Sequence, residues 1–245
     1  MSSTKNLGST TLPKRLLVIG ACGDIGQGIA RGARAEGLDV IAADRNADRL
    51  ARYADGSGIA TVVGDLASEE AAVALWDAAQ VPFGGVDAVA MAVNAPNATK
   101  PLMEWNAEEM AQVYATNLLT HFNAIKAILP RLPETGMLIG IGGGTADFIL
   151  PGMAQLSMLQ AAQRMMYRGF AKERKSGAEI RELMLISMIN GERKRDIAEP
   201  HWVMDTEVGQ HVCAILADSE AFKGPILRLE SRDQVGKPEP VKAKA

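Results

Sequence analysis

The stretch LLVIGACGDIG, residues 16–26, decides the fold of this chain. It begins with four aliphatic residues, which predict a short buried strand, and the helical apolar period of residues 25–36 follows. The glycines are spaced GxxGxxG: Gly20 can form the tight turn, Gly23 lets the backbone approach a pyrophosphate, and Gly26 permits close helix packing. The helix N-terminus then offers free N–H groups to the anion. Glycines in a bare turn are the alternative, but the order of strand, loop and helix favours a nucleotide-binding turn.

An acidic residue follows at the spacing that a nucleotide site requires. Asp44 ends the second apolar run, 39–43, about 20 residues beyond the glycines, where a carboxylate can accept a hydrogen bond from an adenosine ribose 2'-hydroxyl. A 2'-phosphate would face this carboxylate with no Lys or Arg in residues 20–26 to offset it, so the pattern predicts NAD rather than NADP. Arg45 leaves NADP open, and a helix-capping role is the alternative for Asp44.

Short aliphatic segments alternate along the chain with longer segments of helical period. Strands are expected at residues 15–20, 39–43, 60–63, 86–92, 137–141, 179–186 and 225–229, and helices at 25–36, 47–53, 68–79, 107–129, 152–175 and 205–216. Such alternation requires parallel strands joined by right-handed crossovers. The predicted fold class is α/β: a single-domain Rossmann fold with a doubly wound, seven-stranded parallel sheet and three helices on each face.

Composition places this single domain at residues 13–230. The 245 residues, 47% of them hydrophobic and 22% charged, suit one globular domain with a substantial core. The polar residues 1–12 and the Lys-, Pro- and Glu-rich residues 231–245 are expected to be disordered tails. A net charge of -3 without basic clusters argues against nucleic acid and membrane surfaces as partners.

Location and assembly are indicated by other features. Cys22 and Cys213 lie far apart and form no metal-ligand pattern, so neither a disulfide nor a metal site is expected. Without an apolar leader or a span long enough for a bilayer, the expected location is the cytoplasm. The helices 107–129 and 152–175 are long, and surplus apolar surface of this kind is commonly buried by a second copy. We therefore expect a homodimer or homotetramer through these two helices.

Three further motifs accompany the glycine turn, and together they resemble the short-chain dehydrogenases/reductases over residues 14–229. The sequence GDL at 64–66 is similar to the family's adenine-binding segment, and VNAP at 93–96 is similar to its Asn-Asn-Ala-Gly turn, with proline in place of the last glycine. Asn117 matches the helix asparagine that supports a water and proton relay in the family. The resemblance implies a nicotinamide cofactor and hydride-transfer chemistry.

The resemblance breaks at the family's catalytic residues, which are a Tyr-x-x-x-Lys pair on the fifth helix and a Ser on the preceding loop. None of the three tyrosines has a lysine four residues later, where the sequence instead has Ser57, Leu118 and Ala171. Alignment of the end of the fifth helix places Leu156 and Gln160 at the Tyr and Lys positions, with Gly143 near the Ser. Leucine exchanges no proton and a glutamine amide stays neutral, although Gln160 can still bind a ribose.

The implied site residues form two sets. The cofactor-binding set is Gly20, Cys22, Gly23, Asp24, Ile25, Gly26, Asp44, Arg45, Asp65, Leu66, Asn94, Ala95, Gln160 and Ser187. The catalytic candidates are Asn117, Gly143, Asp147 and Gln160. Asp147 is included because it is the nearest titratable side chain in the glycine loop 142–147, whose N–H groups can face an oxyanion. A solvent-exposed loop aspartate is the alternative for this residue.

Three functions fit these residues. The first is an NAD(H)-dependent oxidoreductase that acts on an apolar alcohol or carbonyl substrate with non-standard catalytic residues. Seven methionines within residues 153–204 indicate an adaptable apolar pocket, although core packing explains such a set equally well. Residues 192–196 occupy the family's substrate-lid position and are expected to be a solvated charged face. The alternatives are a non-redox lyase or isomerase on the same fold, and a catalytically silent NAD(H)-binding sensor or partner subunit.

Overall fold

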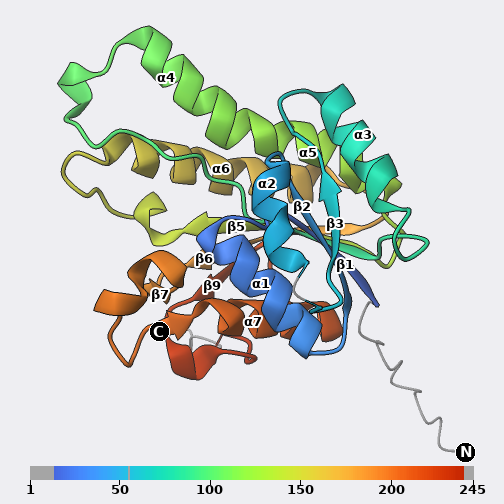
Figure 1. Cartoon of the computed structure of the whole chain (residues 1–245). Helices are drawn as coiled ribbons and strands as arrows, with labels where there is room; N and C mark the ends of the chain where they lie inside the picture. Colours follow the sequence, from blue (N-terminus) through green and yellow to red (C-terminus); the bar gives the residue numbers. More distant parts are fainter. Residues whose placement is uncertain (1–13, 55, 240–245) are drawn as a thin grey trace, which may run out of the picture.

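Seven parallel strands form the central sheet of the computed structural model, in the order β3-β2-β1-β4-β5-β6-β9 (Figure 1). The structure describes residues 14–54 and 56–239, so the predicted tail 1–12 and residues 240–245 of the second predicted tail lie outside the described residues. The strands are β1 (Arg15–Ile19), β2 (Asp39–Asp44), β3 (Ala60–Val63), β4 (Ala88–Met91), β5 (Met137–Gly143), β6 (Glu179–Leu185) and β9 (Ile226–Leu229). The predicted fold class, with its seven-stranded parallel sheet, is confirmed.

Three helices pack on each face of the sheet. One face holds α1 (Asp24–Ala35), α7 (Asp205–Ala217) and the short α2 (Ala47–Leu50), which continues into a 3-10 turn (Ala51–Tyr53). The other face holds α3 (Glu69–Ala79), α5 (Thr120–Ile128) and α6 (Ala154–Glu173). Helices on both faces bury the central strands completely, which explains why they are aliphatic runs rather than alternating patterns. No helix in the described part of the chain is both long and apolar enough to cross a bilayer.

The predicted helix 107–129 is helical throughout but changes its hydrogen-bond pattern in the middle. It begins as α4 (Ala107–Tyr114), which Asn106 and Glu109 start with a reciprocal capping box. A π-helical segment (Ala115–Leu119) then joins α4 to α5, and this segment contains Asn117. Because π segments inside helices frequently occur at functional positions, this one directs attention to the loop that Asn117 contacts.

The connection between β6 and α7 contains structure that the sequence pattern does not predict. β7 (Ile189–Asn190) and β8 (Val203–Met204) form a separate two-stranded parallel sheet. Between them lies the 3-10 segment η6 (Glu192–Ile197). Strands of two residues are too short to show a period, so sequence analysis detects only a charged loop there.

The prediction of a disordered tail from residue 231 is wrong for residues 231–239. A 3-10 turn forms at Arg232–Gln234, and the Arg232 guanidinium pairs with Glu207 of α7 at 2.8 Å. The Gly236 N–H donates to His211 Nδ1, also on α7, at 3.1 Å. A composition rich in Lys, Pro and Glu cannot form a core, but these few polar contacts hold the segment against α7.

Helices α1 and α7 approach each other very closely because glycines lie at their crossing. A Cβ on Gly28 would lie 2.4 Å from Asp205, and a Cβ on Gly32 would lie 2.2 Å from the Thr206 carbonyl oxygen. Gly209 faces them from α7, where a Cβ would lie 2.8 Å from the backbone of α1. These contacts fix the position of α1, and therefore of its N-terminus, against the sheet.

A buried polar pair lies under the glycine-rich end of β5. Glu182 of β6 is fully buried, and its Oε1 accepts a hydrogen bond from Gln163 Nε2 at 2.9 Å. Gln163 Nε2 also donates to the Ile141 carbonyl at 3.0 Å, while Glu182 Oε2 has no hydrogen-bond partner in the described part of the chain. Gly142 makes room for the carboxyl group, since a Cβ there would lie 2.5 Å from Glu182 Oε1. Burial raises the pKa of Glu182 to about 7, against the lowering effect of Gln163 and Arg164.

We predict that Glu182→Gln changes the pH dependence of stability. The ordinary pKa of the carboxyl is 4.5, so between this value and about 7 the unfolded chain loses the proton while the folded chain keeps it. The stability contributed by protonated Glu182 is therefore present below the unfolded pKa and is lost as pH rises toward 7. Since Gln does not titrate, the free energy of unfolding of the variant relative to the wild type should rise by on the order of 2 kcal/mol between pH 4.5 and pH 8.

Urea unfolding of both proteins across this pH range provides the measurement. The control is Glu173→Gln, which removes an exposed carboxylate at the end of α6 instead of a buried one. A pH-independent difference for Glu182→Gln would contradict the prediction.

Candidate functional site

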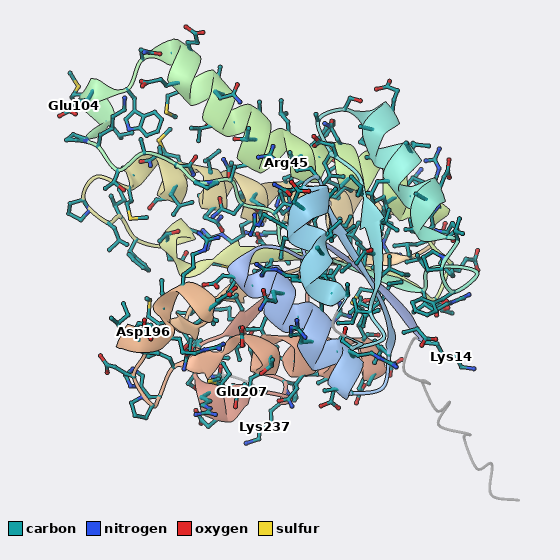
Figure 2. The ribbon with its side chains drawn as sticks, in the orientation of Figure 1. Lys14, Arg45, Glu104, Asp196, Glu207 and Lys237 are labelled. Atoms are coloured by element: carbon teal, nitrogen blue, oxygen red, sulfur yellow. The ribbon has the colours of Figure 1, made fainter. Side chains whose placement is uncertain are left out.

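Two adjoining cavities open at the carboxyl ends of the central strands. β1 pairs with β2 on one side and β4 on the other, so the chain reverses its strand order there and a crevice forms beyond the strand ends. The first cavity has a volume of about 390 Å³ and the second about 380 Å³, and residues 92–94 line both. Figure 2 labels Arg45, on the rim of the first cavity beside α2, and Asp196, in the segment η6 that borders both cavities.

The glycine turn has the geometry that its spacing predicts. Gly20 adopts a φ of +78°, where other L residues are strained, and its carbonyl accepts the Gly23 N–H at 3.0 Å. A Cβ on Gly26 would lie 2.2 Å from the Gly20 carbonyl oxygen, so only glycine allows α1 to begin this close to the strand. Gly23 is the N-cap of α1 and provides no side-chain cap. Gly23 lines the first cavity, and Asp24 and Ile25 line the second, so the first-turn N–H groups of α1 are available to an anion where the two cavities adjoin.

Asp44 fastens this turn to the end of β2. Its Oδ2 accepts the Cys22 N–H at 3.1 Å, and its Oδ1 accepts the Asn46 N–H at 3.1 Å. The N-cap of α2 is Asn46, whose Oδ1 accepts the Arg49 N–H at 3.0 Å, so the alternative role of Asp44 as a helix cap is wrong. Cys22 is buried behind the turn, and burial raises the pKa of its thiol to about 11.

Two further side chains hold the turn, and sequence analysis missed both. Arg49 donates to the Cys22 carbonyl, and the buried Tyr53 donates from its hydroxyl to the Ala21 carbonyl at 2.6 Å. Both come from α2 and its 3-10 extension, and no motif marks them. The contacts join segments more than 25 residues apart, which a local pattern cannot reveal.

The predicted cofactor residues divide between the two cavities. The first cavity is lined by Gly20, Gly23, Asp44, Arg45, Asp65, Leu66, Asn94 and Ala95. The second is lined by Asp24, Ile25, Gln160 and Ser187, and again by Asn94. Cys22 and Gly26 line neither cavity, because they shape the turn from behind. The structure therefore brings twelve of these fourteen residues to one crevice.

The first cavity carries more positive than negative side chains. Arg45, Arg49 and Arg193 line it, together with the carboxylates Asp44 and Asp65. Guanidinium groups beside a free helix N-terminus suit a phosphate group. Arg193 belongs to η6, whose residues 192–196 are exposed as the sequence predicts, and it also lines this cavity, which the sequence pattern does not predict. The donor set fits a nucleotide diphosphate, with the carboxylate of Asp44 at the ribose end.

The second cavity is mainly apolar. Its walls include Phe148, Leu150, Leu156, Ile186 and Met188. Phe148, Leu150 and Met188 keep 50%, 41% and 46% of their surface exposed, which is unusual for large apolar side chains grouped around one cavity. Such a lining suits an apolar ligand.

Gly143 and Gln160 lie together in the wall of the second cavity. The Gly143 N–H donates to Gln160 Oε1, which fixes the orientation of the side-chain amide. Gln160 is 8% exposed and lines the cavity, so its Nε2 is the group left to donate to a ligand. Leu156, one helical turn earlier on α6, lines the same cavity. The three positions singled out by sequence alignment therefore meet at one place.

Asn117 acts on the loop that follows β4 rather than lining a cavity. It is 5% exposed, its Oδ1 accepts the Ala95 N–H at 2.7 Å, and its Nδ2 donates to the Val113 carbonyl at 3.1 Å. Nδ2 also lies 3.3 Å from Asn97 Oδ1. The side chain is thus a positioning residue for the loop, and its amide is already engaged by the protein.

The structure does not support Asp147 as an acid or base. It is exposed and lines neither cavity, and Arg164 and Arg228 both pair with its carboxylate. The hydrogen bond from Arg164, followed by that from Arg228, lowers the pKa of Asp147 below its ordinary value. A carboxylate held ionised outside the cavity cannot supply a proton within it.

In the described ranges, His, Cys, Asp and Glu side chains nowhere gather in a group of three that could hold a metal ion.

Comparison with known proteins matches this geometry to one family. The family model for short chain dehydrogenases matches residues 14–183. An uncharacterized oxidoreductase of Staphylococcus aureus (strain MRSA252) is 28% identical over 178 residues, which cover 70% of this chain and 77% of that protein. A solved short-chain dehydrogenase/reductase from Brucella melitensis has a TM-score of 0.76 at 20% identity, covering 88% of this chain and 94% of that chain.

A second solved structure has a bound cofactor analogue. It is an alcohol dehydrogenase from Thermococcus sibiricus complexed with 5-hydroxy-NADP, with a TM-score of 0.72 at 22% identity. The similarity covers 93% of this chain and 99% of that chain, and at this identity it shows the shared fold. The family model covers well over half of the sequence. The chain therefore belongs to the short-chain dehydrogenase family of oxidoreductases.

Proposed function

We propose that this protein is an NAD(H)-dependent oxidoreductase that acts on an apolar alcohol or carbonyl compound with non-standard catalytic residues. One observation carries the proposal: a cavity suited to a nucleotide diphosphate adjoins an apolar cavity, and the two share residues 92–94. A dinucleotide that extends across this shared edge would bring its nicotinamide to the apolar cavity. Family membership supports the same reaction class.

The chain's own groups would hold such a cofactor at both ends. The first turn of α1 and Arg193 are suited to the diphosphate, and Asp65 and Leu66 border the adenine end of the first cavity. Asp44 is suited to the adenosine ribose. Its Oδ2 already accepts the Cys22 N–H, but a carboxylate oxygen can accept more than one hydrogen bond, so Asp44 can also accept one from the ribose.

The choice of NAD over NADP depends on the charges at the ribose. The carboxylate of Asp44 disfavours a 2'-phosphate, whereas Arg45 and Arg49 line the same cavity and favour one. Arg49 is already bonded to the Cys22 carbonyl, which leaves Arg45 as the cation free to turn toward a phosphate. We propose NAD because Asp44 is the fixed charge and Arg45 is an exposed one.

The proposed active site differs from the family pattern at three positions. A bound nicotinamide cofactor supplies or accepts the hydride. Leu156, Gln160 and Gly143 line the apolar cavity where the family resemblance places Tyr, Lys and Ser. Gln160 can donate from Nε2 to a substrate oxygen or a ribose hydroxyl, but it cannot lose a proton. The proton for the substrate oxygen must then come from water or from another side chain at the cavity.

The two alternative functions are not favoured by the comparisons, which place the chain among oxidoreductases. A lyase or isomerase would form its product without consuming NADH. A sensor or partner subunit would bind NADH without turnover. Measuring both NADH consumption and product formation therefore distinguishes the oxidoreductase, the lyase or isomerase, and the sensor.

We also propose a cytoplasmic homodimer or homotetramer assembled through the helices at 107–129 and 152–175. Leu119 and Phe122 on the first helix are 49% and 40% exposed, and Met158 and Met165 on α6 are 43% and 58% exposed. These helices lie on the same side of the sheet, and Phe122 packs against Phe170 of α6 with ring centroids 5.8 Å apart (Figure 1). The two free cysteines are compatible with a reducing compartment.

We predict that Asp44→Asn weakens NADH binding by roughly tenfold, because the charged acceptor for the ribose is lost and the single amide oxygen can accept the Cys22 N–H but not the Asn46 N–H as well. The same change should narrow the difference in affinity between NADH and NADPH. Calorimetric titration with each nucleotide measures both effects. The control, Asp48→Asn, alters a nearby exposed carboxylate that lines neither cavity. Equal NADH affinity in wild type and Asp44→Asn would refute the ribose contact, and tighter binding of NADPH than NADH would refute the cofactor assignment.

Restoring the family's catalytic residues should increase hydride transfer. The triple variant Gly143→Ser, Leu156→Tyr, Gln160→Lys should raise kcat/KM for apolar ketones with NADH at least about tenfold, because a positioned general acid commonly contributes more than this. Serine fits at position 143, since a Cβ there would lie 3.4 Å from the nearest atom. The matched control replaces Leu156 by Phe instead of Tyr, which supplies the ring without the proton. A triple variant that binds NADH but transfers hydride no faster than its Phe control would contradict the proposed active-site location.

The proposed interface predicts that Phe122→Asp combined with Met165→Asp yields a smaller particle, because two charges would be buried without partners. Sedimentation velocity measures the change in mass. Val81→Asp is the control, since Val81 is 78% exposed and lies outside both helices. An unchanged sedimentation coefficient in the double variant would place the interface elsewhere.

A further inference from the structure

The charged segment η6 (Glu192–Ile197) places one unpaired cation at the apolar cavity. Lys194 lines the second cavity, and it also lines a neighbouring cavity of about 320 Å³ beside residues 94–99. The Lys194 ammonium makes no ion pair within the described residues 14–54 and 56–239. Two neighbouring charges of η6 are paired: Glu192 with Arg52 at 3.3 Å, and Arg195 with Asp205 at 3.9 Å.

Asp24 is the other charged side chain that lines the second cavity, and it is directed at the backbone of the same segment. Its Oδ1 accepts the Arg193 N–H at 3.2 Å. A Cβ on Gly191 would lie 2.6 Å from its Oδ2, so the carboxylate is packed against the start of η6. Asp24 thereby holds η6 over the cavity at the first turn of α1. The Lys194 ammonium remains available for a ligand.

We propose that Lys194 binds the carboxylate of the substrate, and that the substrate class is an apolar acid that carries the reacting hydroxyl or carbonyl group. The apolar walls, including Phe148, Leu156 and Met188, take the hydrocarbon body. The single cation at the edge selects the acid over a neutral compound of the same shape, since no other cation lines this cavity. This inference rests on the proposed function, because it names the substrate class of the same site.

The test compares one apolar acid with its neutral counterpart. Decanoate and decan-1-ol are titrated calorimetrically into the whole protein, with and without NADH. The wild type should bind decanoate at least about fivefold more tightly than decan-1-ol, and added salt should reduce this preference. Lys194→Met should lower the affinity for decanoate to that for decan-1-ol while leaving the alcohol unaffected. Lys194→Arg keeps the charge and should keep the preference.

The matched control is Arg195→Met, which removes a neighbouring charge of η6 that lines neither cavity. It should preserve the preference for the acid. Equal affinities in the wild type, a preference that survives in Lys194→Met, or the absence of saturable decanoate binding would each overturn the proposal. Titration with NADH alone shows whether a negative result concerns the Lys194 proposal or the proposed function. Selective acid binding without NADH binding defeats the cofactor proposal only, and NADH binding without acid selectivity defeats the Lys194 proposal only.

Discussion

The hydrogen bond from the Cys22 N–H to the Asp44 carboxylate joins the turn after β1 to the end of β2, and the shape of the first cavity depends on it. A hydrogen bond to a charged acceptor is worth roughly 1.5–3 kcal/mol, and this one acts on a turn that already contains a glycine at positive φ. Arg49 and Tyr53 hold the carbonyl groups of the same turn from the other side. With the turn fixed, α1 begins at a defined point and its first N–H groups have a defined direction.

Helix packing reinforces the same constraint from the opposite end of α1. Gly28 and Gly32 let this helix lie directly against α7, and α7 in turn receives the contacts of residues 231–239. Asp24 then links the start of α1 to η6 through the Arg193 N–H. The segment bordering both cavities is therefore attached to the first turn of α1. The proposed nucleotide and substrate cavities thus share one supporting helix.

Local patterns predict the scaffold well because its physical causes are local. Completely buried parallel strands appear as aliphatic runs, and the GxxGxxG spacing records the close approach of Gly26 to Gly20. The catalytic side is less predictable because its contacts are distant in sequence. The pairing of Asp147 with Arg164 and Arg228, and the position of Arg193 at the first cavity, join residues from separate elements. The π segment at Asn117 has the same apolar period as an ordinary helix, so no pattern distinguishes it.

We propose that the two cavities together form a site for hydride transfer to an apolar substrate. In the most direct measurement, the wild-type protein is incubated with NADH that carries deuterium at both C4 positions of the nicotinamide and with a series of apolar keto acids, and the products are analysed by mass spectrometry. We expect hydroxy acids that carry one deuterium on the carbinol carbon, with one NADH consumed for each. Product that forms without deuterium, or NADH that binds and is never consumed, would contradict it.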